Sequence, residues 1–191
     1  MANKTTKEII EEFLSINVYN GNGLVKTQFV LNDVQQRLLN LIEEGYDKCG
    51  FGKYRIDGVT TLLCAWMAVR MYEEDNKKIA YIAPNMECVR QAFDKTMYFL
   101  EQLRAYKEMT PLYKIASRSG KTIELTNGSS VMFNSANSFI NSASGRRFDA
   151  VLMDEAGFYK NYPDIRNLAV TNDGMVLETF TVADRKRSKT E

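Results

Sequence analysis

The sequence predicts an α/β protein in which helices flank a mostly parallel central sheet. Extended apolar segments alternate with amphipathic helical segments over most of the 191 residues, which is the pattern of successive βαβ units. One extended segment, Ala150–Met153, is apolar throughout and is followed by Asp154 and Glu155. A buried parallel strand that delivers two carboxylates to the carboxyl edge of a sheet has this pattern.

The first part of the chain predicts two amphipathic helices separated by a break. Apolar residues at helical spacing indicate a helix from Thr5 to Ile16, and Thr5 begins a capping box of the Thr-x-x-Glu type. Asn and Gly residues at 20–23 then interrupt the chain. A second helix is expected from Asp33 to Glu44, with Asn32 or Asp33 as its N-cap.

The remaining elements alternate between short strands and longer helices. In order, they are a strand Cys49–Tyr54, a helix Thr60–Glu73 behind Gly58, a strand Lys78–Ala83, a helix Met86–Leu103, a hairpin of Thr122–Thr126 with Ser130–Phe133, the strand before Asp154, and a strand Met175–Thr181. Asn127-Gly128 between the two hairpin segments predicts a type I′ turn. We find no internal repeat and no low-complexity segment.

Composition excludes several classes of chemistry. The chain has no histidine, which removes Ser-His-Asp hydrolysis, Cys-His proteolysis and His-ligated zinc. Lys and Arg total 25 and Asp and Glu total 24, so a nucleic-acid surface has to be a local patch. Three cysteines, Cys49, Cys64 and Cys88, lack metal-binding spacing and indicate buried, reduced thiols in a cytoplasmic setting. The sequence shows no signal peptide and no apolar run long enough for a membrane span.

Residues 53–60 match a phosphate-binding loop with the lysine displaced. Against G-x-x-x-x-G-K-[ST], the sequence reads Lys53-Tyr-Arg-Ile-Asp-Gly58-Val59-Thr60. Gly58 suits a loop whose backbone amides surround phosphate oxygens, and Thr60 is the expected hydroxyl ligand of Mg²⁺. Val59 stands at the lysine position, and Lys53 stands at the first glycine position. We expect the Lys53 ammonium to reach the phosphates from the front of the loop.

Arg55 and the two carboxylates complete a predicted nucleotide site. Arg55 offers a planar fork for phosphate oxygens or for charge that develops on the terminal phosphoryl group. Asp154 is expected to hold Mg²⁺, and Glu155 to orient or deprotonate the attacking water. The alternative is a simple strand, turn and helix with Lys53 and Arg55 solvated, and a strand that ends in solvated acids. Finding both segments in this order favours the nucleotide site.

From about Gln28 to Thr181, the chain resembles the ATPase domain of the large terminase subunit, the DNA-packaging motor of tailed bacteriophages. Phe29-Val-Leu-Asn-Asp-Val-Gln35 is similar to the segment that recognises adenine in that family, and Lys53 and Arg55 match its irregular phosphate loop. The ordered segments that carry the rest of the resemblance are Ile123-Glu-Leu-Thr-Asn-Gly-Ser-Ser130, Ser135-Ala-Asn-Ser138, Ser144-Gly-Arg-Arg147 and Val176-Leu-Glu-Thr-Phe-Thr181.

The resemblance implies a RecA-like P-loop NTPase fold of the additional-strand type and a role for each matching residue. The implied nucleotide-binding residues of the Walker A loop and its surroundings are Gln35, Lys53, Arg55, Gly58, Val59, Thr60 and Thr61. Thr60 and the Walker B residue Asp154 are the implied Mg²⁺ ligands, and Glu155 and Arg55 the catalytic residues. Thr179 and Thr181 are implied to sense hydrolysis, and Arg146 and Arg147 are candidate arginine fingers for a neighbouring subunit.

Each of these assignments has a plainer alternative. Gln35 by itself is read as an exposed helix residue, and Thr179 and Thr181 as ordinary strand threonines. Arg146 and Arg147 are equally read as a solvated basic turn. The basic run Arg185–Lys189 near the end of the chain is either solvated or in contact with nucleic acid.

The implied function is the coupling of Mg·ATP hydrolysis to the translocation of double-stranded DNA into a procapsid. We expect one ATPase domain over 1–191, with a lead-in at 1–27, a nucleotide-binding core at 28–181 and a basic tail at 182–191. No nuclease domain or nuclease activity is expected. An excised domain, a split subunit and a truncated product all fit this length.

The expected partners are double-stranded DNA, the portal protein, the small terminase subunit and further copies of the chain in a ring. We expect a monomer in isolation, no membrane contact, and a location in the host cell cytoplasm, docked on the procapsid during packaging. Two other readings are a non-hydrolysing nucleotide-dependent binding module and a helicase-like ATPase. The helicase reading requires a second RecA-like lobe.

Overall fold

The computed structural model describes residues 4–106, 113–116, 121–171 and 173–182. Within them, seven strands form one sheet in the order β3-β9-β8-β4-β7-β6-β5. The four pairs from β3 to β7 are parallel, and the two pairs that involve β6 are antiparallel. The strands are β3 (Lys48–Lys53), β4 (Lys78–Ala83), β5 (Tyr113–Ala116), β6 (Lys121–Leu125), β7 (Ser130–Ser135), β8 (Ala150–Met153) and β9 (Met175–Thr181).

The predicted α/β class and mostly parallel sheet are therefore confirmed. β9 lies between β3, which leads into the predicted phosphate loop, and β8, which leads into Asp154. This order places one additional strand between the two halves of the predicted nucleotide site. The carboxyl ends of all three parallel strands meet at the same edge of the sheet.

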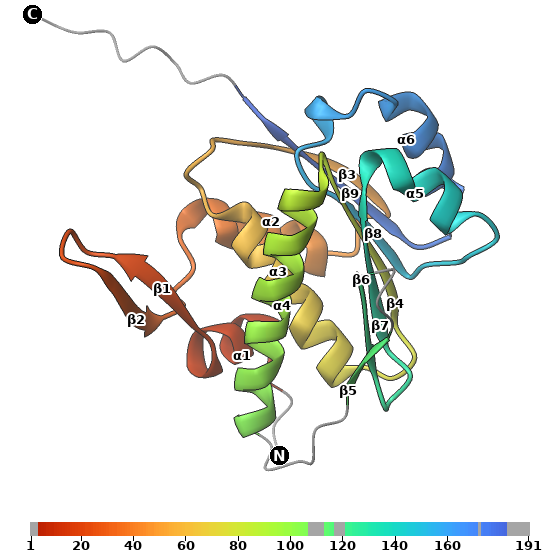
Figure 1. Cartoon of the computed structure of the whole chain (residues 1–191). Helices are drawn as coiled ribbons and strands as arrows, with labels where there is room; N and C mark the ends of the chain where they lie inside the picture. Colours follow the sequence, from red (N-terminus) through yellow and green to blue (C-terminus); the bar gives the residue numbers. More distant parts are fainter. Residues whose placement is uncertain (1–3, 107–112, 117–120, 172, 183–191) are drawn as a thin grey trace, which may run out of the picture.

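Helices cover both faces of the sheet, as Figure 1 shows. On one face lie α1 (Thr6–Phe13), α2 (Asp33–Glu43), α3 (Val59–Glu73) and α4 (Met86–Tyr106), and on the other lie α5 (Ala136–Ala143) and α6 (Tyr162–Val170). Alternation along β4 divides the core, because Ile79 and Tyr81 pack with the first group of helices and Ala80 and Ile82 with the second. Each face of the sheet has its own apolar cluster.

The central helix α3 is buried over most of its length. Ten of its residues are buried, so its sequence is apolar on nearly all sides of the helix and has no single amphipathic stripe. It packs against α4, α2 and α1 on the same side of the sheet. A helix held this way gives the loop in front of it, residues 54–58, a rigid support.

The helix predicted over Thr5–Ile16 is shorter in the structure. The capping box at Thr5 is present, but α1 ends at Phe13, and Leu14 is already extended. The chain then forms a hairpin of β1 (Ser15–Tyr19) and β2 (Leu24–Gln28), which projects from the body in Figure 1. β-Branched and aromatic residues on both sides of Asn20-Gly-Asn-Gly23 favour this hairpin, which the sequence analysis took for a break.

Most other predicted elements are present with ends shifted by a few residues. β4 and β9 have the predicted bounds, α2 begins after its predicted N-cap Asn32, and α4 continues to Tyr106. Four elements were not predicted from the sequence: β5, α5, α6 and a short 3-10 helix, η1 (Ala156–Phe158). These elements have few residues in which an apolar period can be recognised. The Arg185–Lys189 run lies outside the described residues.

The predicted type I′ turn at Asn127-Gly128 is wrong. That turn requires positive φ at both residues, but Gly128 has a φ of +83° and Asn127 is not in the positive-φ region. The Gly128 amide donates to the Leu125 carbonyl at 2.9 Å, and the Leu125 amide donates to the Ser129 carbonyl at 2.8 Å. The loop therefore has three residues and ends in a left-handed glycine. The Asn127 side chain, bonded to the Met71 carbonyl at 2.8 Å, holds the loop on the end of α3.

All three cysteines are free, with Cys64 buried and Cys49 and Cys88 half-buried, so only Cys64 has the predicted full burial. In the part of the chain that the structure describes, no helix combines the length and apolar character that a membrane crossing needs.

Candidate nucleotide site

The predicted phosphate loop is a tight turn that leads into α3. The Tyr54 amide donates to the Asp57 carboxylate at 2.6 Å, and the Asp57 amide donates to the Tyr54 carbonyl at 3.2 Å. Gly58 is the N-cap of α3, with a φ of +68° and a ψ of +21°. Glycine adopts this left-handed conformation without steric cost. The amides of the first turn of α3 consequently face the loop, as a phosphate site requires.

Gln35 supports this loop from behind. Its side-chain amide donates to the Gly58 carbonyl at 3.0 Å, while its carbonyl oxygen accepts the Asn32 amide at 3.1 Å in a capping box. The residue is 4% exposed, so reading it as an exposed helix residue is wrong. Both ends of its side-chain amide are occupied within the protein. Its role in reading adenine stays a prediction.

Asp154 is the most heavily bonded side chain of the site. Thr60 Oγ1 donates to its Oδ2 at 2.5 Å, and Thr179 Oγ1 donates to its Oδ1 at 2.6 Å. Tyr81, from β4, also donates to Oδ2, at 2.9 Å. The carboxylate is 3% exposed and is held by groups from four elements, since Lys53 on β3 is its ion-pair partner. The alternative of a strand that ends in solvated acids is therefore wrong for Asp154.

Lys53 bridges the two carboxylates. Its Nζ lies 3.1 Å from Asp154 Oδ1 and 2.9 Å from Glu155 Oε1. Lys53 is 4% exposed, so the reading of a solvated lysine is wrong as well. The expected position at the front of the loop is found, but in this structure the ammonium contacts the carboxylates.

Glu155 has an unusual backbone conformation. Its φ of +58° and ψ of +41° are left-handed, which costs a residue with a Cβ about 1–2 kcal/mol. The Thr179 hydroxyl accepts its amide at 3.1 Å, and the Thr181 hydroxyl donates to its carboxylate at 2.5 Å. Strained residues of this kind cluster at functional sites. Both predicted coupling threonines thus bond to the acidic pair.

The electrostatics of the group are set by burial and by mutual attraction. Burial alone would raise the pKa of Asp154, but Lys53 and the hydroxyl donors on Thr179, Thr60 and Tyr81 outweigh it and lower that pKa. Burial alone would lower the pKa of Lys53, whereas the two carboxylates raise it. Burial, together with the nearby Asp154 charge, raises the pKa of Tyr81 well above its usual range. The site therefore contains a carboxylate and an ammonium that are both charged at neutral pH.

A cleft of about 720 Å³ opens beside these groups. Thr60, Asp154 and Glu155 line it together with Arg55, and Thr181 and Phe158 extend its wall. The α4 side supplies Asn85, Cys88, Gln91 and Lys95. Val59, at the position of the usual lysine, is 1% exposed and belongs to the core. Thr61 accepts a hydrogen bond from Lys95 Nζ at 2.8 Å.

Thr60 and Asp154 suit the magnesium ion that accompanies a nucleotide. Mg²⁺ is usually held by one or two protein oxygens plus phosphates and waters, and these two residues place a hydroxyl and a carboxylate oxygen 2.5 Å apart. Among the described residues, there is no group of three His, Cys, Asp or Glu side chains of the kind that binds a metal unaided. The donors therefore fit a metal that arrives with its ligand.

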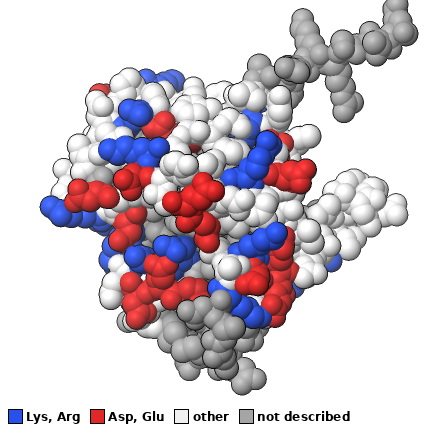
Figure 2. Space-filling view, turned by 180° about the vertical axis from the view of Figure 1, so that it is seen from behind, with Lys and Arg blue, Asp and Glu red and all other residues white. Residues whose placement is uncertain are grey.

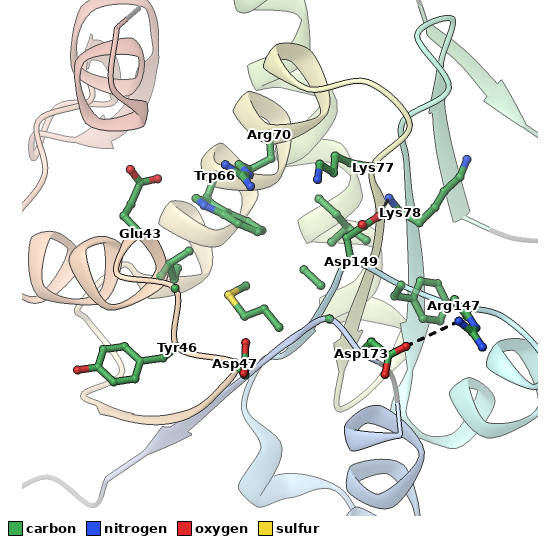
Figure 3. Close-up of a pocket in the computed structure, with 17 residues that line it drawn as sticks. Glu43, Tyr46, Asp47, Trp66, Arg70, Lys77, Lys78, Arg147, Asp149 and Asp173 are labelled. Carbon is green, nitrogen blue, oxygen red and sulfur yellow. Dashed lines mark hydrogen bonds and ion pairs between the residues drawn. The ribbon is translucent and has the colours of Figure 1, made fainter.

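The candidate arginine fingers lie far from this cleft. Arg147 precedes β8 and lines a second pocket, of about 660 Å³, at the opposite edge of the sheet. Figure 3 shows Arg147 facing Asp173, with the two side chains 3.7 Å apart. Both side chains are more than nine-tenths exposed. Arg146 and Arg147 are thus not brought to the carboxylates of their own chain.

Two polar contributors to the site were not predicted. Tyr81 was only included in the strand Lys78–Ala83, and Lys95 only in the helix Met86–Leu103. Neither belongs to a spaced motif, so only the positions of β4 beside β8 and of α4 beside α3 reveal them. Asp154 at the end of β8 was the signal in the sequence that could have pointed to them, because strands next to β8 bring their side chains to the same edge of the sheet.

The arrangement defines a class of protein. A left-handed glycine turn after β3 leads into the buried helix α3, and an acidic pair follows β8. One additional strand, β9, lies between β3 and β8 in the sheet. Together these are the features of a RecA-like fold of the additional-strand type.

Solved structures with a similar fold include several phage large terminases. The chain superposes on the large terminase ATPase domain of Thermus phage P74-26 with a TM-score of 0.62, at 15% identity, over 83% of this chain and 68% of that one. For the HK97 bacteriophage large terminase the TM-score is 0.67, at 18% identity, over 92% of this chain and 36% of that one. The large terminase of a thermophilic bacteriophage, solved in complex with ADP, matches with a TM-score of 0.55, at 12% identity, over 79% of this chain and 39% of that one.

These likenesses show that the chain has the fold of phage large terminase ATPase domains. No protein-family model and no curated protein sequence matches it. The chain spans less than two-fifths of the length of the HK97 terminase and of the terminase solved with ADP.

Proposed function

We propose that this chain is the ATP-hydrolysing domain of a viral DNA-packaging motor. The observation that carries the proposal is the convergence of Lys53, Thr60 and Thr179 on Asp154 beside an open cleft, in the fold of phage terminase ATPase domains. Such motors convert nucleotide hydrolysis into movement of double-stranded DNA into a procapsid.

In the proposed reaction, each residue has a separate task. The loop amides and Arg55 bind the triphosphate, and Lys53 balances the acidic pair or turns to the phosphates when they arrive. Thr60 and Asp154 hold Mg²⁺, which when bound neutralises charge on the phosphate oxygens. Glu155 accepts the proton of the attacking water. Thr179 and Thr181, bonded to Asp154 and Glu155, pass the change in the site to β9.

The proposed partners follow from the same reading. They are double-stranded DNA, a portal protein, a small terminase subunit and further copies of this chain in a ring, in the cytoplasm of an infected host. Figure 2 shows acidic and basic side chains interspersed over one face of the molecule. The face seen in this view therefore offers no broad basic surface for DNA.

Val59 favours a second candidate function. Its burial in the core leaves the usual lysine position of the loop without a cation, as in a module that binds nucleotide and does not hydrolyse it. The two functions differ in turnover. ATP binding without hydrolysis, even with DNA and a portal protein present, supports the second candidate.

The deciding experiment is Mg²⁺-dependent ATP binding and steady-state hydrolysis by the purified chain, with and without double-stranded DNA. Lys53→Ala and Glu155→Gln are measured beside it, with circular dichroism to confirm that each variant is folded. A motor domain predicts turnover that falls in both variants, while Glu155→Gln still binds ATP. Failure of the parent chain to bind ATP at millimolar concentration would overturn the proposed site.

A further inference from the structure

In this structure, neither predicted lysine position places a cation in the lining of the cleft. Val59 is buried in the core, and Lys53 is enclosed by Asp154 and Glu155 and does not line the cleft. A triphosphate bound with Mg²⁺ still carries net negative charge. Among the residues that the structure describes, the cations that line the cleft are Arg55 and Lys95.

Lys95 reaches the cleft from the side of α4. It is half-buried, and its Nζ donates to Thr61 Oγ1 at 2.8 Å. Thr61 lies in the first turn of α3, next to Thr60, whose hydroxyl bonds to Asp154. The Lys95 ammonium is thus held at the start of α3, where phosphate oxygens meet backbone amides.

This placement is electrostatically unfavourable without an anion. The N-terminus of a helix carries a positive partial charge, which repels a neighbouring cation. Within the described part of the chain, no carboxylate lies within ion-pair distance of Lys95. A phosphate oxygen between the ammonium and the helix would attract both, because it accepts hydrogen bonds from the Lys95 ammonium and from the amides of the helix.

We propose that Lys95 is a phosphate-binding residue of this site and contacts the terminal phosphate of the bound nucleotide. The proposal rests on the nucleotide function proposed above. The sheet order indicates which phosphate Lys95 meets. β4, which leads into α4, lies on the far side of β8 from the phosphate-loop strand β3. A triphosphate that extends from the loop towards Glu155 presents its last phosphate to that side. Lys95 then supplies a cation from outside the loop, where Val59 supplies none.

The test compares Lys95→Met with the parent chain in calorimetric titrations with Mg²⁺ and either ADP or a non-hydrolysable ATP analogue. Methionine keeps the length of the side chain and removes its charge. We expect about tenfold weaker binding of the ATP analogue, the loss of one charge-assisted hydrogen bond, and little change for ADP. Lys95→Arg, which keeps the charge, retains the preference for the ATP analogue.

Lys26→Met, an exposed lysine on β2, is the matched control for the loss of one positive charge and leaves both affinities unchanged. Thermal unfolding confirms that each variant is folded, and Lys95→Gln replaces Lys95→Met if the latter is not. Equal loss for both nucleotides overturns contact with the terminal phosphate, and no loss for either overturns any phosphate contact. If the parent binds neither nucleotide, the proposed function itself fails, and this inference fails with it.

Discussion

Lys53 stabilises a pair of carboxylates that would otherwise repel each other in a buried position. Removing one partner of a buried ion pair leaves an uncompensated charge, which costs about 3–5 kcal/mol. Glu155 is partly exposed, with 22% of its side chain accessible, so we place the cost at the lower end. Lys53→Met is expected to lower the free energy of unfolding by about 3 kcal/mol, measured by urea denaturation.

The control for this prediction is a solvent-exposed ion pair of the same protein. Arg147 and Asp173 are both more than nine-tenths exposed, and exposed pairs contribute little because solvent screens them. Arg147→Met should therefore leave the unfolding midpoint in urea unchanged. A Lys53→Met midpoint that also matches the parent's would show that the buried ammonium does not hold the acidic pair together.

Asp154 should titrate below its ordinary value of 3.8, because Lys53 and three hydroxyl donors outweigh its burial. A carboxyl with a lowered pKa stabilises the folded state above pH 3.8 and loses that contribution as the pH falls through the folded-state pKa. Lys53, with a raised pKa, loses its contribution only as the pH rises above 10.5 and through its own folded-state pKa.

The measurement is the carboxyl carbon shift of Asp154 followed by NMR against pH. An inflection below 3.8 is expected, together with acid destabilisation below that pH. An Asp154 carboxyl that titrates above its ordinary value would mean that burial dominates over the ion pair, and the described geometry would be wrong.

How far the sequence predicts the site depends on whether residues share a motif. Thr60 and Asp154 were assigned from loop spacing and from an apolar run, and the structure brings them together. Tyr81 and Lys95 lie far in sequence from both motifs, so only the tertiary arrangement adds them. The partner of Lys53 was also not predictable, because a loop pattern does not say whether an ammonium faces phosphate or carboxylate.

At the scale of elements, α3 depends on its entry turn. Gly58 has left-handed backbone angles, and a Cβ there would lie 2.8 Å from Gln35 Nε2. Gly58→Ala therefore combines backbone strain of about 1–2 kcal/mol with displacement of an amide that bonds to the loop and to the start of α2. We expect a loss of about 2–3 kcal/mol in the free energy of unfolding.

Gly145→Ala is the matched control for Gly58→Ala. Gly145 also has left-handed angles, with a φ of +73°, but a Cβ there meets nothing within 4 Å. It should cost only the backbone strain, so the difference between the two variants in denaturant titrations isolates the Gln35 contact. Equal losses would mean that Gln35 yields freely and does not fix the loop.

Prediction of elements succeeded for the mostly apolar segments and failed for several segments in which polar and apolar residues are mixed. The buried run of α3 and the apolar strands β4, β8 and β9 were assigned correctly. The hairpin β1-β2 escaped detection because β2 is exposed at every position and shows no alternation between buried and exposed residues. In α5, Asn and Ser fill half of the eight positions, and only Phe139 and Ile140 are large apolar residues, so the helical period gave too weak a signal.

At the scale of the whole molecule, the separation of Arg146 and Arg147 from the acidic pair has a consequence for assembly. The strand β8 lies between them, with Arg147 at its amino end and Asp154 at its carboxyl end. Within one chain these arginines cannot contact a nucleotide beside Asp154. If they act as arginine fingers, they act on a neighbouring copy in a head-to-tail ring.

This arrangement predicts complementation between two inactive chains. Glu155→Gln retains the arginines but lacks the residue that activates water, whereas the double variant Arg146→Ala/Arg147→Ala retains the complete acidic pair. Under conditions where the parent shows DNA-stimulated ATP hydrolysis, each should be slow alone. A mixture should recover turnover, because an intact acidic pair then meets a neighbour's intact arginines.

Arg90→Ala, which removes an exposed arginine of α4, should behave like the parent. A mixture no faster than the average of its two components, or a double variant as fast as the parent, would place the activating cation elsewhere and leave Arg146 and Arg147 as a solvated turn.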